Sequence, residues 1–201
     1  INNPFDIGGI RSLSKAGEKL KLNKKYIVHV GRFEKLKRQD LLVRGFSLTG
    51  LKDQYMLVFL GDGPLKSECE LLCKTLKIDS LFMPWMSNPF CVMKHASLLV
   101  LCSEQEGFGN VLVEGLIAGT SVISSDCDFG PREILVDNLS ERLFSTNSTR
   151  SLAVALKEFV DRPPSPRDFD LSRYEMSKIT QDYTQAAAFF HDKHIGFLQN
   201  S

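Results

Sequence analysis

The chain has 201 residues, of which 43% are hydrophobic and 24% are charged, and its formal net charge is +1. That length and composition suit one domain that buries a single core. A net charge so close to zero argues against a protein held to nucleic acid by bulk electrostatics. No apolar run approaches the roughly 18 residues of a membrane-spanning helix. The first residues lack both a Met start and the pattern of a signal peptide, so we expect a piece of a longer chain.

Five cysteines are scattered over apolar or helical contexts. An odd number without the spacing of a disulfide framework predicts reduced thiols in a cytoplasmic protein. Cys69 and Cys73 stand four residues apart on an expected helix, a spacing that suits two ligands of one metal ion. No His or second Cys pair follows nearby, so the sequence does not complete a metal site there.

Apolar runs of strand length alternate along the chain with segments of helical pattern. The expected strands are 26–31, 55–61, 80–85, 98–102, 121–125 and 142–145; helices are expected at 40–50, 64–78, 88–96 and 151–160, and another begins near Asn110. Such alternation predicts an α/β fold in which a Rossmann-like parallel sheet carries helices on both faces. His29, in the middle of the first strand, is expected in the core.

The end of the chain departs from this alternation. Residues 161–170 are rich in proline and cannot continue a helix. The stretch 173–190 then places Met176, Ile179 and Tyr183 on one face, as in an amphipathic helix that packs on a partner surface. We therefore predict that a separate helical arm ends the chain.

Three loops that follow expected strands carry unusual residues. Residues 31–37, GRFEKLK, follow the first strand; residues 61–64, GDGP, follow the second; residues 103–110, SEQEGFGN, follow the fourth. In an open parallel sheet, ligands bind outside the carboxyl ends of the strands. We therefore expect these loops to converge on one crevice.

The third loop has the chemistry of a ligand site. Gly107 and Gly109 allow the backbone to approach a ligand closely. A helix beginning near Asn110 would direct its first free N–H groups and its dipole at an anion. Glu114 lies one turn into that helix and leans back toward its mouth, while Glu106 faces the mouth from the other side. Two such carboxylates suit sugar hydroxyl groups that flank a phosphate.

The first loop would supply the positive charge that a diphosphate needs, through Arg32 and Lys37. Each residue alone has a plainer interpretation. A Glu in a first helical turn stabilises the helix dipole without any ligand, a basic loop is more often a solvated face, and GDGP alone is a common turn. Their joint placement at one edge of the sheet favours a ligand site.

At these positions the sequence resembles the C-terminal, nucleotide-sugar-binding domain of the retaining GT-B glycosyltransferases of family 4, also called group 1. The family carries Gly-Arg and then Lys after the first strand of this domain, matched by Gly31, Arg32 and Lys37. Its Gly-x-Gly-Pro is matched by GDGP at 61–64. Its signature of two glutamates separated by seven residues is matched by EGFGNVLVE at 106–114.

The resemblance extends from about residue 3 to about Tyr183. It includes DCDFGPREIL at 126–135, which is similar to a segment of members that build bacterial surface polysaccharides. The implied fold is the second Rossmann-like domain of GT-B, with a C-terminal helix that crosses toward a missing N-terminal domain. The implied divisions are a donor-binding domain at 1–172, of which 1–17 is the remnant of an interdomain linker, and a C-terminal helix and tail at 173–201.

The resemblance also implies a role for each residue of the loops. A donor diphosphate would be held by Arg32, Lys37 and the backbone N–H groups of Val111 and Leu112, and the ribose by Glu114. The transferred sugar would be held by Glu106, taken as the catalytic residue, with Gly107, Phe108, Gly109 and Asn110. The base or nucleotide loop would be Gly61, Met83, Pro84, Trp85 and Met86. No metal ion and no cofactor is expected, because cations and helix amides stabilise the leaving diphosphate.

The function implied is transfer of a sugar, with retention of configuration, from a nucleotide sugar to a glycan or lipid-linked acceptor. Uridine is favoured over guanosine as the base. The parent enzyme would act in the cytoplasm in surface polysaccharide or lipopolysaccharide synthesis, with peripheral association at the inner face of the membrane as an option, and would have no nucleic-acid partner. The isolated chain is expected to bind the donor without transferring its sugar.

Other interpretations stay open. One is a nucleotide-sugar epimerase on the same fold, against which the Glu pair and the GPREIL segment favour the transferase. Another is a nucleotide-binding module without catalysis of its own. A third concerns Asp126-Cys127-Asp128, which spells the Asp-x-Asp with which GT-A enzymes hold a divalent metal ion. Its place inside the DCDFGPREIL segment makes the metal interpretation the less favoured one.

Overall fold

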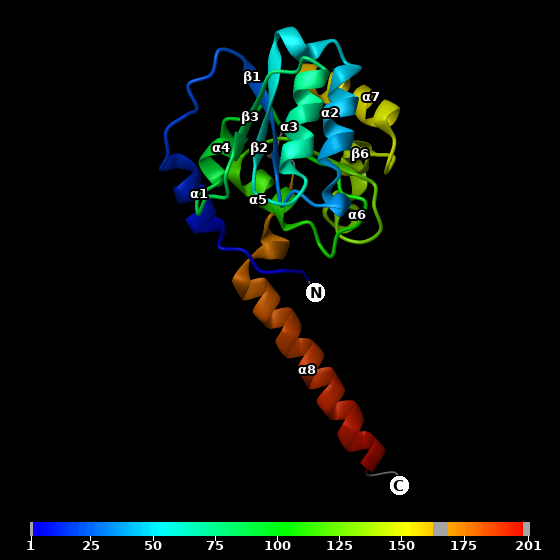
Figure 1. The fold of residues 1–201 in the computed structure, drawn as a ribbon. Coiled ribbons are helices and arrows are strands. Elements are labelled where there is room, and N and C mark those ends of the chain that lie inside the picture. Colours follow the sequence, from blue (N-terminus) through cyan, green and yellow to red (C-terminus); the bar gives the residue numbers. More distant parts are fainter. Residues whose placement is uncertain (1, 163–168, 199–201) are drawn as a thin grey trace.

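The computed structural model describes the backbone of residues 2–162 and 169–198. Its sheet has six parallel strands in the order β3-β2-β1-β4-β5-β6 (Figure 1). The strands are β1 (Lys25–Val30), β2 (Tyr55–Leu60), β3 (Ser80–Met83), β4 (Leu98–Leu101), β5 (Val122–Ser125) and β6 (Leu143–Phe144). The helices are α1 (Ile7–Lys15), α2 (Gln39–Ser47), α3 (Lys66–Thr75), α4 (Phe90–Lys94), α5 (Asn110–Ala118), α6 (Pro131–Ile134), α7 (Thr149–Asp161) and α8 (Met176–Leu198), with a short 3-10 turn η1 (Lys35–Lys37). The predicted α/β fold is thus confirmed.

The sheet is buried on both faces. Helices α1, α4 and α5 pack together over one face, and α2, α3 and α7 cover the other (Figure 1). Alternate residues of β1 enter the two cores, because successive side chains of a strand point to opposite faces. Val28 belongs to the first core and Ile27 to the second. Each fully buried side chain of this size contributes about 1.5–3 kcal/mol to folding.

Between β1 and β4 the strand order reverses, because the chain leaves β1 on one side toward β2 and returns on the other side with β4. The pairing of the two strands ends at Val28–Leu99, although β1 continues to Val30 and β4 to Leu101. The two strands therefore separate toward their carboxyl ends. A reversal of this kind opens a crevice at the carboxyl edge of the sheet.

Helix α1 is an element that the sequence patterns do not predict. Its two glycines lower its helix propensity, but the Asp6 carboxylate accepts a hydrogen bond from the Gly9 N–H at 2.8 Å and so caps its first turn. The helix packs against α4 and α5. Tertiary contact thus compensates for weak local preference in the segment 1–17, whose assignment to an interdomain linker stays a prediction.

The beginning of the chain lies against the beginning of the C-terminal arm. The Phe5 N–H donates to the Tyr174 carbonyl at 3.0 Å, and the two rings pack edge to face with their centroids 6.0 Å apart. Phe108, in the loop before α5, packs on both rings. This aromatic group ties both ends of the domain to one of the predicted ligand loops. The domain boundary at residue 172 stays a prediction.

The C-terminal arm is helix α8, which extends away from the domain (Figure 1). Of the predicted apolar stripe, Ile179 is buried, whereas Met176 and Tyr183 are 58% and 59% exposed. The arm therefore leaves much of that stripe uncovered in this chain. None of the described helices, α8 included, combines the length and the apolarity needed to cross a membrane.

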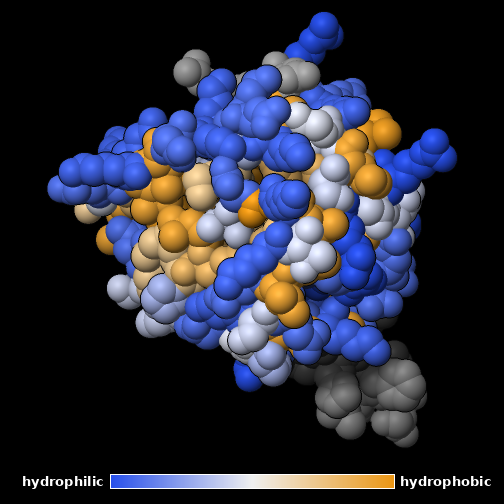
Figure 2. Space-filling model, turned by 45° about the horizontal axis from the view of Figure 1, so that its top comes forward, coloured by the Kyte–Doolittle hydropathy of each residue, from blue (hydrophilic) through white to orange (hydrophobic). Residues whose placement is uncertain are grey.

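Hydrophilic residues dominate the face seen in Figure 2, and hydrophobic residues reach the surface in patches between them. Large hydrophobic side chains that are exposed in the described part of the chain come from many separate elements: Leu13, Leu36, Leu48, Leu71, Trp85, Phe129, Val154, Met176 and Tyr183. Scattered exposure of this kind is normal for globular proteins. Among them, Trp85 borders a cavity at the carboxyl edge of the sheet.

Gly61 generates a prediction about stability. Its φ is +141°, and a Cβ atom there would collide with the backbone carbonyl of Gly31. Gly61→Ala should therefore lower the free energy of unfolding by about 2–4 kcal/mol, through backbone strain and displacement of the neighbouring loop. Gly50→Ala is the matched control, because Gly50 also has a positive φ but nothing lies within 4 Å of its would-be Cβ; it should cost only about 1 kcal/mol. Urea unfolding measures both, and equal losses would contradict the close approach.

Candidate functional site

The predicted crevice is present at the carboxyl edge of the sheet. A cavity of about 590 Å³ lies between the loops that follow β1 and β4. It is lined by Asn3, Val30, Gly31, Arg32, Lys37, Glu106, Gly107, Phe108, Gly109, Asn110, Val111 and Glu114. The loops that carry the predicted cations and the predicted carboxylates therefore meet, as their positions after parallel strands indicated.

A second cavity of about 540 Å³ adjoins the first, because Val30, Gly31 and Arg32 line both. Its other walls come from the loops after β2 and β3: Leu60, Gly61, Asp62, Gly63, Trp85, Met86 and Pro89. The two cavities together form one groove that crosses the ends of β3, β2, β1 and β4. A ligand with several linked parts can lie along such a groove.

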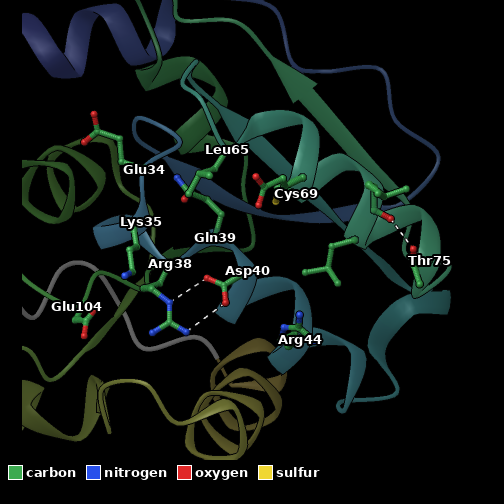
Figure 3. Close-up of a pocket in the computed structure, with 13 residues that line it drawn as sticks. Glu34, Lys35, Arg38, Gln39, Asp40, Arg44, Leu65, Cys69, Thr75 and Glu104 are labelled. Atoms are coloured by element: carbon green, nitrogen blue, oxygen red, sulfur yellow. Dashed lines mark hydrogen bonds and ion pairs between the residues drawn. The ribbon is translucent and has the colours of Figure 1, made fainter.

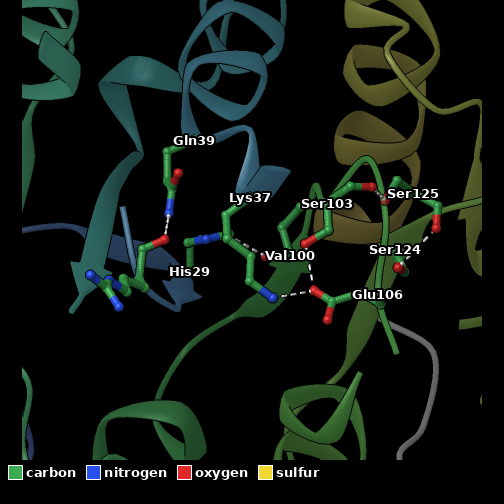
Figure 4. A network of polar contacts seen from close by, with 9 residues as sticks. His29, Lys37, Gln39, Val100, Ser103, Glu106, Ser124 and Ser125 are labelled. Carbon is green, nitrogen blue, oxygen red and sulfur yellow. Dashed lines mark hydrogen bonds and ion pairs between the residues drawn. The ribbon is translucent and has the colours of Figure 1, made fainter. Parts of the chain in front are cut away.

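Lys37 and Glu106 form an ion pair across the gap between β1 and β4 (Figure 4). The Lys37 Nζ lies 2.6 Å from the Glu106 Oε1, and the Ser103 hydroxyl donates to the same oxygen at 2.6 Å. The Glu106 side chain is only 10% exposed. A carboxylate so far removed from water is costly to bury unless it is paired and hydrogen-bonded in this way. The two residues that the sequence assigned to different parts of a ligand thus contact each other.

Glu114 faces the same cavity from the first turns of α5. Burial raises the pKa of this carboxyl group above its ordinary value. None of the described side chains or backbone groups donates a hydrogen bond to it, in contrast to Glu106. A half-buried carboxylate without a protein donor is expected to receive hydrogen bonds from another source. Hydroxyl groups of a ligand in the cavity are suitable donors.

The first two residues of α5, Asn110 and Val111, line the cavity. Gly109 precedes the helix in the left-handed conformation, with φ +89°, which lets the chain turn sharply from the loop into the helix. Val111 lines the cavity, whereas Leu112 is fully buried. The Leu112 N–H already donates to the Gly109 carbonyl at 2.9 Å. Of the two predicted amides, only that of Val111 is therefore placed to meet an anion.

Arg32 lies on the rim shared by the two cavities. Its side chain is 70% exposed, and its Nε lies 3.0 Å from the Glu34 Oε1. An exposed ion pair of this kind contributes at most about 1 kcal/mol, so Arg32 is able to exchange Glu34 for a ligand. Gln39, buried at the start of α2, donates from its side chain to the Arg32 carbonyl at 2.9 Å and fixes the backbone there.

The nucleotide loop predicted from the sequence borders the second cavity through Gly61, Trp85 and Met86. Asp62 connects its two halves, because its carboxylate accepts from the Trp85 N–H at 2.8 Å and from Lys66 at 3.0 Å. The Trp85 N–H, and secondly Lys66, hold the Asp62 pKa below its usual range. Met83 and Pro84 do not line the cavity; the Met83 carbonyl instead accepts from the Gly61 N–H at 3.1 Å.

Four residues that sequence reasoning did not assign to the site help to build it. Asn3 donates to the side chain of Asn110 at 2.9 Å, at the start of α5. Gln39 and Ser103 anchor Arg32 and Glu106, as described above. His29 lies at the point where β1 and β4 separate. Short polar residues such as these carry no motif, so only the three-dimensional contacts reveal them.

The Asp-x-Asp segment lies in a different setting from a metal site. The Asp126 carboxylate accepts two hydrogen bonds from Arg132, at 2.5 and 2.9 Å, so a cation already occupies both oxygens. Within the described residues, no three or more His, Cys, Asp or Glu side chains are close enough to share a metal ion. All five cysteines are buried free thiols. The geometry favours a cation-based anion site over the metal interpretation of Asp126 and Asp128.

A larger cavity, of about 700 Å³, lies between α2 and α3 (Figure 3). Its charged lining residues are Glu34, Lys35, Arg38, Asp40, Arg44, Glu68 and Glu104. Carboxylates outnumber cations in this set, and Arg38 is already bound to Asp40 by two hydrogen bonds. The smaller groove at the carboxyl edge is the better candidate for an anionic ligand, because Arg32, Lys37 and the amino end of α5 meet there.

A parallel sheet that reverses its strand order between β1 and β4, with two cations and two carboxylates at that point, defines a Rossmann-like ligand-binding domain. The model of one protein family, described as glycosyl transferases group 1, matches residues 11–176. The chain belongs to this family.

Its similar relatives include two bacterial glycosyltransferases. The N-acetylgalactosamine-N,N'-diacetylbacillosaminyl-diphospho-undecaprenol 4-alpha-N-acetylgalactosaminyltransferase of Campylobacter jejuni is 34% identical over 163 residues, which cover 80% of this chain and 44% of that protein. The lipopolysaccharide 1,6-galactosyltransferase of Salmonella typhimurium is 32% identical over 126 residues, which cover 59% of this chain and 34% of that protein. The chain thus spans less than half the length of these relatives.

Solved structures show the same fold. The apo form of the lipopolysaccharide outer core galactosyltransferase WaaB matches with a TM-score of 0.74 and 24% identity, over 92% of this chain and 54% of that one. HepE of Anabaena, in complex with UDP and glucose, matches with a TM-score of 0.77 and 18% identity, over 94% of this chain and 56% of that one. The predicted fold, the C-terminal half of a GT-B structure, is confirmed.

His29 generates a prediction about pH. Burial lowers the pKa of its ring to about 4, against the effect of a hydrogen bond to the Val100 carbonyl and with the help of the Lys37 charge. The unfolded ring takes up a proton near pH 6.5 and the folded ring does not, so His29 should remove up to about 3 kcal/mol of stability as the pH falls from about 6.5 to about 4. The His29→Asn variant has no titrating ring at this position, so its free energy of unfolding should not show this decrease with falling pH. Urea unfolding of both proteins across that range measures it, and parallel slopes would contradict a buried neutral ring.

Proposed function

We propose that the chain is the donor-binding domain of a retaining glycosyltransferase. The donor would be a nucleotide diphosphate sugar, with uridine as the base, and the acceptor a glycan or a lipid-linked sugar in surface polysaccharide or lipopolysaccharide synthesis. The observation that carries the proposal is the groove itself. Glu114 is half-buried, accepts no hydrogen bond from the described residues, and faces the same cavity as the Lys37–Glu106 pair. Family membership and the fold of the solved relatives support it.

The diphosphate would lie beside Lys37 and Arg32, at the mouth of α5. It brings about two negative charges to a cavity that already holds Glu106 and Glu114. The helix end supplies only about half a positive charge, so the two cations provide most of the balance. Lys37 can donate to the diphosphate while it keeps its bond to Glu106, because an ammonium group has three protons. The Val111 N–H would complete the anion site.

The remaining parts of the donor would follow the groove in both directions. Glu114 would accept hydrogen bonds from the ribose hydroxyls. Glu106, with the loop 107–110, would hold the transferred sugar. The base would enter the second cavity, next to Gly61 and the exposed Trp85 ring. In this arrangement the leaving diphosphate is stabilised by Lys37, Arg32 and helix dipoles, the kind of preorganised electrostatic contribution that lowers a barrier most.

The acceptor would enter from outside this chain. The chain spans about half of each solved relative, and the stripe on α8 is only partly covered. We propose that a further domain of the same protein covers that stripe and supplies the acceptor half of the site. The 201-residue chain alone would then bind the donor without transferring its sugar, and attack would take place on the face from which the diphosphate leaves. Action in the cytoplasm, at the inner face of the membrane, remains part of the proposal.

The test is donor binding without metal. Saturation-transfer NMR on the 201-residue chain, in EDTA, with UDP-glucose, UDP-galactose, UDP-N-acetylglucosamine and GDP-mannose as the panel, should show contact of the uridine and ribose protons with the protein. Binding that requires manganese would overturn the cation-based site in favour of Asp126 and Asp128. Binding of none of the nucleotide sugars would overturn the proposed function. Release of an altered sugar nucleotide would favour an epimerase instead.

The cations generate a quantitative prediction. Loss of a hydrogen bond to a charged group costs about 1.5–3 kcal/mol, so Lys37→Ala should weaken UDP binding by roughly 10- to 100-fold. Arg32→Ala should cost about 10-fold, because its exposed guanidinium is better screened. Lys35→Ala is the matched control: Lys35 is equally basic, exposed and in the same loop, but does not line the groove. Calorimetric titration measures the affinity of each variant for UDP. Equal losses in all three variants would show that the loop attracts UDP only through its diffuse positive charge, and not through specific contacts from Lys37 and Arg32.

Substitutions of the two carboxylates should affect the binding of different ligands. Glu114→Gln should weaken both free UDP and the intact donor, because the ribose is present in each. Glu106→Gln should leave the affinity for free UDP within about threefold of the wild type, a small change being expected because the substitution also releases Lys37 from its ion pair. The same variant should bind the intact nucleotide sugar more weakly. Calorimetry with UDP and with UDP-sugar measures both. Equal effects of the two variants on free UDP would show that Glu106 has a different partner.

A further inference from the structure

The point where β1 and β4 separate is bridged by a side chain. Backbone pairing of the two strands ends at Val28–Leu99. One residue later, the His29 ring lies between them, and its Nδ1 is 2.9 Å from the Val100 carbonyl oxygen (Figure 4). The ring is 1% exposed. His29 therefore replaces a strand-to-strand hydrogen bond at the place where the crevice begins.

This hydrogen bond decides which ring nitrogen carries the proton. A carbonyl oxygen only accepts, so Nδ1 must be the donor. Burial keeps the ring neutral, because it lowers the pKa to about 4. The second nitrogen, Nε2, therefore carries a lone pair and can only accept. It is fully buried and has no hydrogen-bond partner within the described part of the chain. A buried acceptor of this kind is costly unless some state of the protein satisfies it.

The Nε2 atom lies under the floor of the groove. A Cβ atom on Gly31 would be 3.6 Å from it, and Gly31 lines both cavities. The charges that act on the ring are those of Lys37 and Glu106. Figure 4 shows the ring next to the Lys37 side chain, on the side opposite to Ser103. The unpaired lone pair is thus buried beside Gly31, within the electrostatic influence of the ion pair that closes the crevice.

We propose that His29 is a positioning residue for Lys37. When a diphosphate binds beside the ammonium group of Lys37, one of the three ammonium N–H groups donates a hydrogen bond to Nε2 of His29. The proposal rests on the function proposed above and adds to it the residue that orients the phosphate-binding cation.

A neutral imidazole suits this role better than another carboxylate would. Lys37 already shares its charge with Glu106 at 2.6 Å, and a second anion beside it would cancel the positive charge that the diphosphate needs. A neutral acceptor orients the ammonium group without neutralising it. The low pKa also prevents the ring from becoming a competing cation above pH about 5, which would repel Lys37.

The structure allows the two nitrogens to be tested separately. In His29→Asn, the side-chain amide can keep the hydrogen bond to Val100 from a position close to that of Nδ1, but nothing replaces Nε2. The wild type and this variant should have thermal midpoints within a few degrees of each other, whereas UDP affinity should fall about 5- to 10-fold. His29→Gln, whose amide oxygen reaches toward the Nε2 position, should recover part of that loss.

A double-mutant cycle then asks whether His29 acts through Lys37. In a Lys37→Met background, His29→Asn should cause no further loss of UDP affinity, because the group that it positions is absent. In a Lys35→Met background, the same substitution should cost its full 5- to 10-fold. Calorimetry of the single and double variants with UDP, at constant pH and salt, completes the cycle.

The outcomes are distinct. Unchanged UDP affinity in His29→Asn, or a loss that persists undiminished in the Lys37→Met background, would overturn the positioning role and leave His29 as a spacer between strands. If the variants fail to fold, long-range ¹H–¹⁵N NMR of the wild type replaces them: the His29 Nε2 resonance should be that of an unprotonated nitrogen and should move on addition of UDP, and a signal that stays in place overturns the proposal. A wild type that binds no UDP at all overturns the proposed function, and this inference with it.

Discussion

The ion pair between Lys37 and Glu106 is the interaction on which the rest of the groove depends. It joins the loop after β1 to the loop after β4 across the gap where the two strands separate. Because the Glu106 side chain is almost completely removed from water, loss of Lys37 would leave an uncompensated charge in a region of low dielectric constant. The pair therefore sets the width of the groove and balances its charge before any ligand enters. A diphosphate then shares a cation that is already in place, rather than collecting one from solvent.

The surrounding contacts hold both ends of this pair from outside the groove. Gln39 binds the Arg32 carbonyl, the Glu104 N–H donates to the Leu36 carbonyl at 2.8 Å, and Ser103 binds Glu106. Two of these three contacts end on backbone carbonyls, so the loop after β1 is fixed without using the side chains that face the ligand. Preorganisation of this kind lowers the entropy that binding must remove. The aromatic group of Phe5, Phe108 and Tyr174 extends the support to the beginning of the chain and to the residues that precede α8.

The local sequence predicted the parts of this protein that depend on short-range rules. The alternation of strand and helix patterns predicted the parallel sheet, and the loops after the strands predicted the groove, because parallel strands present their carboxyl ends at one edge. The Gly-Arg, GDGP and Glu-pair motifs were sufficient to place Lys37, Glu106 and Glu114 in one cavity. Helix α5 begins at Asn110, as its glycine-rich approach indicated. These features were predictable because each depends on the pattern of a few neighbouring residues in the sequence.

Only the tertiary structure decided which of these groups contact each other. Lys37 and Glu106 are 69 positions apart in the chain, and no pattern indicates that they pair with each other rather than with separate parts of a ligand. The same holds for α1, whose glycines weaken it locally and whose packing on α4 and α5 stabilises it. His29 carries no motif at all: in sequence it is one polar residue in a buried strand, and only the divergence of β1 from β4 places its ring against the Val100 carbonyl. Contacts of this kind arise from long-range packing, so the chain determines them through the whole fold and not through any segment that can be read alone.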